Sequence, residues 1–109
     1  MNDAQKCTYT VFWSDEDACF IATVAEFPSL SHADDTQLSA LEGIVSLVEG
    51  VLEDYQSDGE EPPTPLGSRT YSGRFALRMT PETHRWVAMQ AAQEGVSINR
   101  YINSKLAMV

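Results

Sequence analysis

Two arginines, Arg74 and Arg78, lie four residues apart in a segment where polar and apolar residues alternate. This period of two is typical of a half-buried strand, and it would place Ala76 between the two arginines on one face. The other face would be apolar and would consist of Phe75, Leu77 and Met79. Two such strands, paired as an antiparallel ribbon, fit the major groove of DNA and would bring the guanidinium groups of both chains into it.

The residues after this segment predict two helices. Thr80 is a suitable N-cap and Pro81 a suitable first helical residue, so the first helix is expected to begin there and to end before Gly95. Ser97 can cap a second helix, which carries apolar residues at helical spacing as far as Leu106. One short strand and two helices, about 34 residues in all, cannot bury a core alone, so this part of the chain is expected to dimerise.

This stretch resembles the ribbon-helix-helix family of DNA-binding domains. The resemblance is carried by the alternating segment, the Thr80-Pro81-Glu82 helix start and the turn Gly95-Val96-Ser97-Ile98-Asn99. It implies base reading by the strand and phosphate binding by backbone N–H groups where the second helix begins, since helix N-termini favour anions. The residues concerned are Arg74, Ala76, Arg78, Ser97, Ile98 and Asn99. The alternative is a small dimerisation tail in which the two arginines are incidental.

Charge is distributed unevenly along the 109 residues, whose formal net charge is −9. Residues 1–67 contain 14 acidic residues and one basic residue, Lys6, whereas residues 68–109 contain six basic residues and two acidic ones. A basic part suits a polyanion and an acidic part suits a basic partner. We therefore expect two domains, 1–67 and 68–109, joined through the Pro-rich connector Ser57–Ser72.

The N-terminal part predicts a small antiparallel sheet covered by one helix. Residues 8–13 and 18–25 are rich in β-forming side chains and flank an acidic turn, which indicates a β-hairpin. A turn and a short third strand are expected within Phe27–Ala33, because Pro28 cannot donate to a central ladder. Apolar residues then recur every three or four positions, which predicts one long helix over Gln37–Gln56.

Both faces of the predicted hairpin are apolar, and a single helix can cover only one of them. One face would carry Tyr9, Val11, Trp13, Cys19 and Ile21, and the other would carry Phe12, Phe20, Ala22 and Val24. The uncovered face or edge is expected to bind another protein. The candidate partner-binding residues are Tyr9, Val11, Trp13, Phe20 and Ile21.

The order of these elements resembles the HicB family of antitoxins. The residues that carry the resemblance are Tyr9-Thr10-Val11, Phe20-Ile21-Ala22, the corner Glu26-Phe27-Pro28, the helix start Asp35-Thr36 with Ala40, and the exit Glu60-Glu61-Pro62-Pro63. The resemblance implies an α+β protein in which a partly reduced RNase-H-like domain binds and neutralises a small mRNA-cleaving toxin, HicA. The ribbon-helix-helix tail would bind operator DNA and repress the shared operon. The alternative is a stand-alone ribbon-helix-helix transcriptional regulator whose N-terminal domain oligomerises or senses a ligand.

No set of residues predicts catalysis. Two-metal nuclease chemistry needs carboxylates that converge from separate core elements. Here Asp15–Asp17 share one turn, while Asp34 and Asp35 lie at one helix cap. His32 has neither a nucleophile nor a second histidine beside it in the sequence. We therefore expect no enzymatic activity, no metal and no cofactor.

The compartment follows from two further features. Cys7 and Cys19 are too few for a disulfide framework and have no zinc-ligand spacing, so both are expected to be small core residues. No membrane-length apolar run and no signal-peptide pattern are present. The expectation is a cytoplasmic protein that forms a homodimer through its C-terminal domain, with a tetramer as the alternative.

Overall fold

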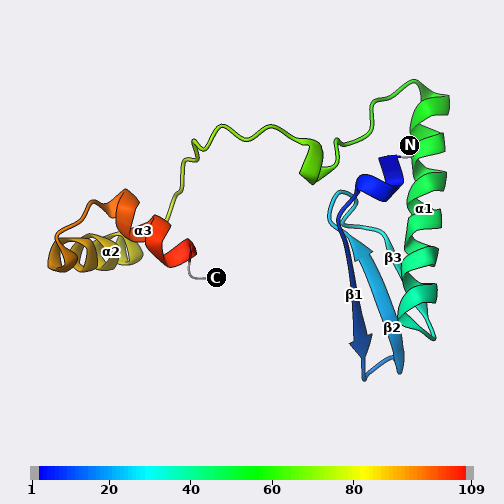
Figure 1. Cartoon of the computed structure of the whole chain (residues 1–109), viewed down its shortest axis with the longest axis horizontal. Coiled ribbons are helices and arrows are strands. Elements are labelled where there is room, and N and C mark those ends of the chain that lie inside the picture. The colour runs from blue at the N-terminus through cyan, green and yellow to red at the C-terminus, as the bar shows by residue number, and fades with distance from the viewer. Residues whose placement is uncertain (1–2, 108–109) are drawn as a thin grey trace. The chain divides into compact units, whose positions relative to one another are not determined.

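The computed structural model describes residues 3–107 and divides the chain into two compact units, Met1–Tyr71 and Ser72–Val109. The elements of the first unit are η1 (Asp3–Lys6), β1 (Tyr9–Ser14), β2 (Cys19–Val24), β3 (Ser31–Asp34), α1 (Gln37–Asp58) and η2 (Leu66–Ser68) (Figure 1). The second unit contains α2 (Pro81–Glu94) and α3 (Ile98–Leu106). The chain is therefore α+β, as predicted.

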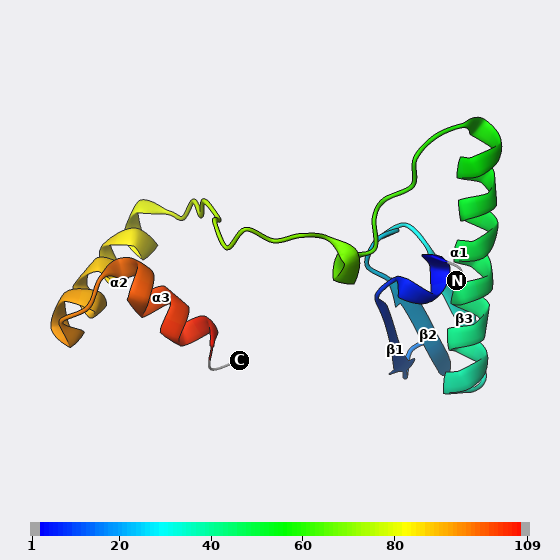
Figure 2. The ribbon, with the colours of Figure 1, turned by 45° about the horizontal axis from the view of Figure 1, so that its top comes forward.

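The strands form an antiparallel sheet in the order β1-β2-β3, and α1 lies along one face of this sheet (Figure 2). α1 packs mainly against β2 and β3, and η1 also packs against α1. The hairpin, the short third strand and the covering helix expected from the sequence are thus confirmed.

The strand register corrects the predicted faces of the hairpin. Tyr9 pairs with Val24, and Trp13 pairs with Phe20. Paired residues share a face, so Tyr9, Val11 and Trp13 lie on the same face as Phe20, Ala22 and Val24. The grouping of Tyr9, Val11 and Trp13 with Cys19 and Ile21 was wrong. Its cause is the turn between Ser14 and Cys19, which pairs odd-numbered residues of β1 with even-numbered residues of β2.

The core of the first unit lies between β2 and α1. Its largest fully buried side chains are Val24 on the sheet and Ile44 and Val48 on the helix. Smaller residues complete it: Ala4, Ala22, Phe27 and Ala40. The helix therefore buries the stripe that its three- and four-residue spacing predicted, against the face of β2 that carries Val24.

Local signals define the bounds of α1. The Thr36 hydroxyl accepts a hydrogen bond from the N–H of Ser39 at 3.0 Å and so caps the first turn. Gly59 ends the helix in the left-handed region, with φ at 72°, and its N–H bonds the carbonyl oxygen of Gln56. α1 thus extends two residues beyond the predicted end. Among the described residues, no helix has both the length and the hydrophobicity of a membrane span.

The two predicted helices of the second unit are confirmed, with their caps. The Thr80 hydroxyl accepts a hydrogen bond from the N–H of Thr83 at 3.2 Å, and Gly95 ends α2 with φ at 69°. The contact between the helices buries only a small cluster, Val87, Ala91 and Tyr101. Partly buried residues surround it: Met79, Val96, Ile98 and Ile102. This core is too small to cover the apolar side chains of the unit.

The strand predicted at Arg74–Met79 is not formed in the single chain, which corrects the sequence expectation. These residues belong to no helix or strand. A strand is defined by a hydrogen-bonded neighbour, and no other strand pairs with this segment within residues 3–107. The alternation of side chains favours a β-strand, but a strand forms only when a second strand supplies its hydrogen bonds.

Candidate DNA-binding and protein-binding surfaces

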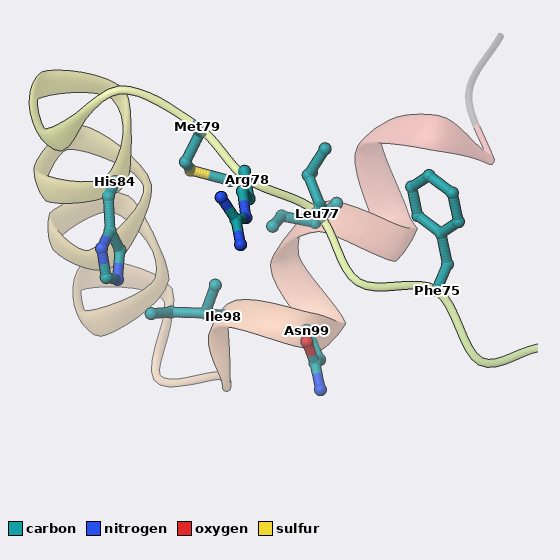
Figure 3. Close-up of a pocket in the computed structure, with 8 residues that line it drawn as sticks. Phe75, Leu77, Arg78, Met79, His84, Ile98 and Asn99 are labelled. Atoms are coloured by element: carbon teal, nitrogen blue, oxygen red, sulfur yellow. The ribbon is translucent and has the colours of Figure 1, made fainter.

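The segment that contains Arg78 borders a groove of about 440 Å³ at the start of α3 (Figure 3). Among the residues that line the groove are Phe75, Leu77, Arg78, Met79, Ile98 and Asn99. The groove thus brings three predicted DNA-binding residues, Arg78, Ile98 and Asn99, to one place. Arg74, Ala76 and Ser97 are not in its lining.

The apolar side chains of this segment are poorly covered. Phe75 is 87% exposed and Leu77 is 56% exposed. Arg78 lines the same groove as Leu77 and Met79, so the single chain does not sort the segment into a polar face and an apolar face. In a paired strand, alternate side chains point to opposite faces. The predicted separation of arginines from apolar side chains therefore requires a ladder partner.

The start of α3 presents backbone donors to the solvent. Ser97 caps the helix, because its hydroxyl accepts a hydrogen bond from the N–H of Arg100 at 3.1 Å. The N–H groups of Ile98 and Asn99 lie in the first turn, where a helix has no internal acceptor for them. Among the residues that the structure describes, nothing else accepts a hydrogen bond from them. These two N–H groups can therefore donate hydrogen bonds to an anionic oxygen.

The guanidinium groups of Arg74 and Arg78 are available to a ligand. Both side chains are exposed, and neither guanidinium makes an ion pair or hydrogen bond within the described part of the chain. Two other cations are engaged: Nε of Arg69 donates to the carbonyl oxygen of Thr64 at 2.9 Å, and Nζ of Lys105 lies 5.2 Å from the centre of the Tyr101 ring. The guanidinium groups of Arg85 and Arg100, like those of Arg74 and Arg78, make no such contact within residues 3–107.

The five candidate partner-binding residues do not form one exposed surface. Tyr9, Val11 and Phe20 pack against the core. The Tyr9 hydroxyl donates to the carbonyl oxygen of Ala4, and burial raises the pKa of Tyr9 to about 12. Ile21 lies on the opposite face of the sheet. The side chains of Tyr9, Val11 and Phe20 thus serve the fold, which leaves them little area for a partner.

Trp13 is the most accessible of the five candidates, since the residue is 50% exposed whereas the other four are half-buried. Its indole N–H donates to a carboxylate oxygen of Asp15 at 2.6 Å, and its ring meets Phe20 edge-on at 5.1 Å. Phe12, which was not among the candidates, is 46% exposed on the face that α1 does not cover, opposite Ile21. The alternation of side chains along the strand could have identified Phe12, but the predicted grouping placed it on the face of Phe20, Ala22 and Val24. The exposed acidic residues Asp15–Asp17 lie in the turn that follows β1.

Glu26 is a second residue whose role the sequence did not reveal. It is only 8% exposed. Its carboxylate accepts hydrogen bonds from the N–H of Thr8 at 2.8 Å, from the Thr8 hydroxyl at 3.0 Å and from the N–H of Leu66 at 2.9 Å. Burial opposes ionisation, but the backbone donors of Leu66 and Thr8 outweigh it and hold the pKa of Glu26 below its ordinary value.

The contact between Glu26 and Leu66 attaches the predicted connector Ser57–Ser72 to the first unit. Pro65 is buried, and η2 follows at Leu66–Ser68. The Tyr71 hydroxyl donates to the carbonyl oxygen of Leu66 at 3.0 Å. Much of the segment Ser57–Ser72 is thus either the end of α1 or packed onto the first unit, rather than a free linker.

His32 and Asp34 form the one histidine–carboxylate contact within residues 3–107, with 3.2 Å between Nε2 and Oδ2. A hydrogen bond from the N–H of Asp35, with the contact to His32, holds the pKa of Asp34 below its ordinary value. The imidazole packs on α1 at Gly43, where any Cβ would overlap the ring. The role visible here is packing of β3 on α1. Across the described residues, no three His, Cys, Asp or Glu side chains gather as metal ligands.

The comparisons with known proteins bear mainly on the C-terminal half. The family model described as the HicB family matches residues 51–106. No curated protein and no solved structure matches the chain significantly. The matched residues make up more than half of the chain and include the end of α1, the Glu60-Glu61-Pro62-Pro63 exit, the arginine segment, α2 and α3. The chain therefore belongs to the HicB family, a family of antitoxins.

Proposed function

We propose that the protein is the antitoxin of a type II toxin–antitoxin pair, which neutralises a HicA-like mRNA-cleaving toxin and represses its own operon. The observation that carries the proposal is the match to the HicB family, because this is an antitoxin family. The N-terminal unit would be the toxin-binding part, with a reduced RNase-H-like fold. The C-terminal unit would be a dimeric ribbon-helix-helix domain that binds operator DNA.

The charge of the N-terminal unit supports a basic protein partner. Residues 1–67 contain 14 acidic residues against one basic residue. A toxin that grips RNA needs basic surface, so opposite charges would accelerate the encounter. Nucleic acid would be repelled by the same unit. The exposed aromatic side chains of Phe12 and Trp13 offer the apolar contacts that affinity requires.

The exposed apolar residues of the C-terminal unit support dimerisation. Phe75 and Leu77 lie beside a groove rather than in a core. Pairing the segment Arg74–Met79 with its copy would give each strand its ladder and would turn Phe75, Leu77 and Met79 onto the helices. Arg74, Ala76 and Arg78 would then share the opposite face, which is the arrangement that enters a major groove.

The experiment that tests the proposal uses the reading frame beside this gene. Its product is purified, tested for RNA cleavage and titrated with the full-length chain. We expect complete inhibition at about one antitoxin per toxin. A gel shift with the DNA upstream of the gene tests repression separately. If the adjacent product cleaves RNA but is not inhibited, the antitoxin proposal fails. The chain would then be a stand-alone regulator if it still binds its upstream DNA.

A further inference from the structure

The outer edge of β1 presents backbone groups that the fold leaves unpaired. β1 is an edge strand in the order β1-β2-β3. The N–H of Ala25 donates to the carbonyl oxygen of Thr8 at 2.9 Å, so the backbone of Thr8 faces β2. In an antiparallel pair the facing direction alternates, which turns the N–H and C=O groups of Val11 and Trp13 away from β2. Within residues 3–107, nothing is hydrogen-bonded to these outward groups.

This edge lacks the features that usually protect an exposed strand. β1 has six residues, with the sequence YTVFWS, and contains no proline, lysine or other charged side chain. Its pairing with β2 runs without a bulge from Tyr9 to Ser14. Natural proteins shorten, charge, bulge or cover such edges, because an open edge recruits other strands. The other edge follows that rule: β3 has four residues and contains His32 and Asp34.

The side chains around the edge indicate how an added strand would be held. Phe12 and Trp13 are adjacent in β1, so they project from opposite faces of the sheet. Both are about half exposed. A strand placed along β1 would therefore have an aromatic side chain against each of its faces, in addition to the backbone hydrogen bonds. Strand addition draws its affinity from main-chain bonds and its specificity from such side-chain contacts.

The negative charge of the N-terminal unit favours a basic partner at the edge of β1. A second copy would bring one acidic N-terminal unit against another, and each has 14 acidic residues and one basic residue over 1–67. The exposed carboxylates of Asp15–Asp17 lie at the end of β1, where they would meet the strand of any partner. Like charges oppose such an association, whereas a basic chain gains from it.

We propose that the HicA-like toxin binds by adding a β-strand of its own to the outer edge of β1, next to Val11 and Trp13. This inference rests on the proposed antitoxin function and specifies its mode of binding. The toxin strand is basic or is flanked by basic residues that face Asp15–Asp17. Val11 thus contributes to recognition through its main chain, while its side chain stays in the core.

Amide hydrogen exchange on the full-length chain tests the inference, with the purified product of the adjacent reading frame as the probe. In the free chain, the inward amides of Thr10 and Phe12 are expected to exchange slowly and the outward amides of Val11 and Trp13 rapidly. In the complex, the outward amides should slow by at least about 100-fold, because they acquire acceptors. Thr10 and Phe12 serve as internal references for the integrity of the sheet.

A pair of variants isolates the backbone donor. Val11→Pro removes the outward N–H without removing a bond to β2, and proline is tolerated on an edge strand. Val11→Ala also loses side-chain packing but retains the N–H. Toxin affinity should be about tenfold lower for Val11→Pro than for Val11→Ala. Slow exchange of Thr10 and Phe12 in both variants shows that the sheet persists.

The possible outcomes separate the inference from the proposed function. An inhibited complex in which Val11 and Trp13 still exchange rapidly overturns strand addition and leaves the antitoxin function intact. Protection of these amides in the free chain that rises with its concentration identifies a second copy as the occupant, and also overturns the inference. If the adjacent product does not bind, the toxin-binding proposal and the inference both fail.

Discussion

The carboxylate of Glu26 accepts a hydrogen bond from the backbone N–H of Leu66, 40 residues further along the chain, at 2.9 Å. The same carboxylate binds the N–H and the hydroxyl of Thr8. One buried side chain therefore joins the start of β1, the corner after β2 and the connector that leaves α1. The connector is anchored to the N-terminal unit at this point, well after the end of α1 at Asp58.

Removing the charge of Glu26 should destabilise the N-terminal unit. Glu26→Gln replaces one acceptor oxygen by a donor, which leaves at least one of the N–H groups of Thr8 and Leu66 without an acceptor. A buried donor left unsatisfied costs about 1–3 kcal/mol, so the free energy of unfolding should fall by that amount. Urea denaturation measures it. Glu42→Gln, on the exposed part of α1, is the matched control and should change stability by less than about 0.5 kcal/mol.

The same contact should make stability depend on pH in the acid range. The folded pKa of Glu26 lies below its ordinary value of 4.5, so its contribution is fully present above pH 4.5 and is lost as pH falls through the folded pKa. Denaturation of the parent and of Glu26→Gln should therefore give a stability difference that is constant near neutral pH and shrinks below pH 4.5. A difference that stays unchanged down to pH 3 would argue against a charge-dependent contact.

DNA binding should depend on the two arginines of the segment before α2. Arg74→Ala and Arg78→Ala should each weaken operator binding by about 1–3 kcal/mol per lost base contact. Arg85→Ala, an exposed residue on α2, removes the same charge outside this segment and should have a smaller effect. Gel-shift titrations at one fixed salt concentration measure all three, because phosphate contacts vary steeply with salt. Equal losses for all three variants would reduce the role of Arg74 and Arg78 to general charge.

Dimerisation should depend on the apolar side chains of the same segment. Phe75→Ala combined with Leu77→Ala removes the side chains that a strand pair would turn onto α2 and α3, so the double variant should be monomeric at concentrations where the parent is dimeric. Sedimentation equilibrium measures the mass. Leu38→Ala removes a similarly exposed side chain from α1 and should leave the mass unchanged. A dimeric double variant would place the interface elsewhere in the chain.

The arginine variants also test whether the two proposed activities are separable. A chain with Arg74→Ala and Arg78→Ala should inhibit the toxin as well as the parent does, because both changes lie in the second unit. RNA-cleavage assays with the parent as reference measure inhibition. Loss of inhibition in a folded variant would mean that toxin binding uses the C-terminal unit.

The helices of this protein could be predicted from its residues, because their signals are local. The hydroxyls of Thr36, Thr80 and Ser97 each accept a bond from an N–H three residues ahead, and Gly59 and Gly95 end their helices in the left-handed region. These contacts span a few residues, so residue type and spacing suffice to predict the helices, although the predicted end of α1 at Gln56 fell two residues short of the observed one. The existence of the hairpin was predictable for the same reason.

Long-range contacts in the folded chain set which residues share a face of the hairpin and what Glu26 binds. The faces depend on the register between β1 and β2, and a shift of one residue moves every side chain to the other side. The donors to Glu26 come from Thr8 and Leu66, which are 18 and 40 residues away. The alternation in Arg74–Met79 predicted a strand that the single chain does not form, because its hydrogen bonds need a neighbour that this segment lacks within residues 3–107.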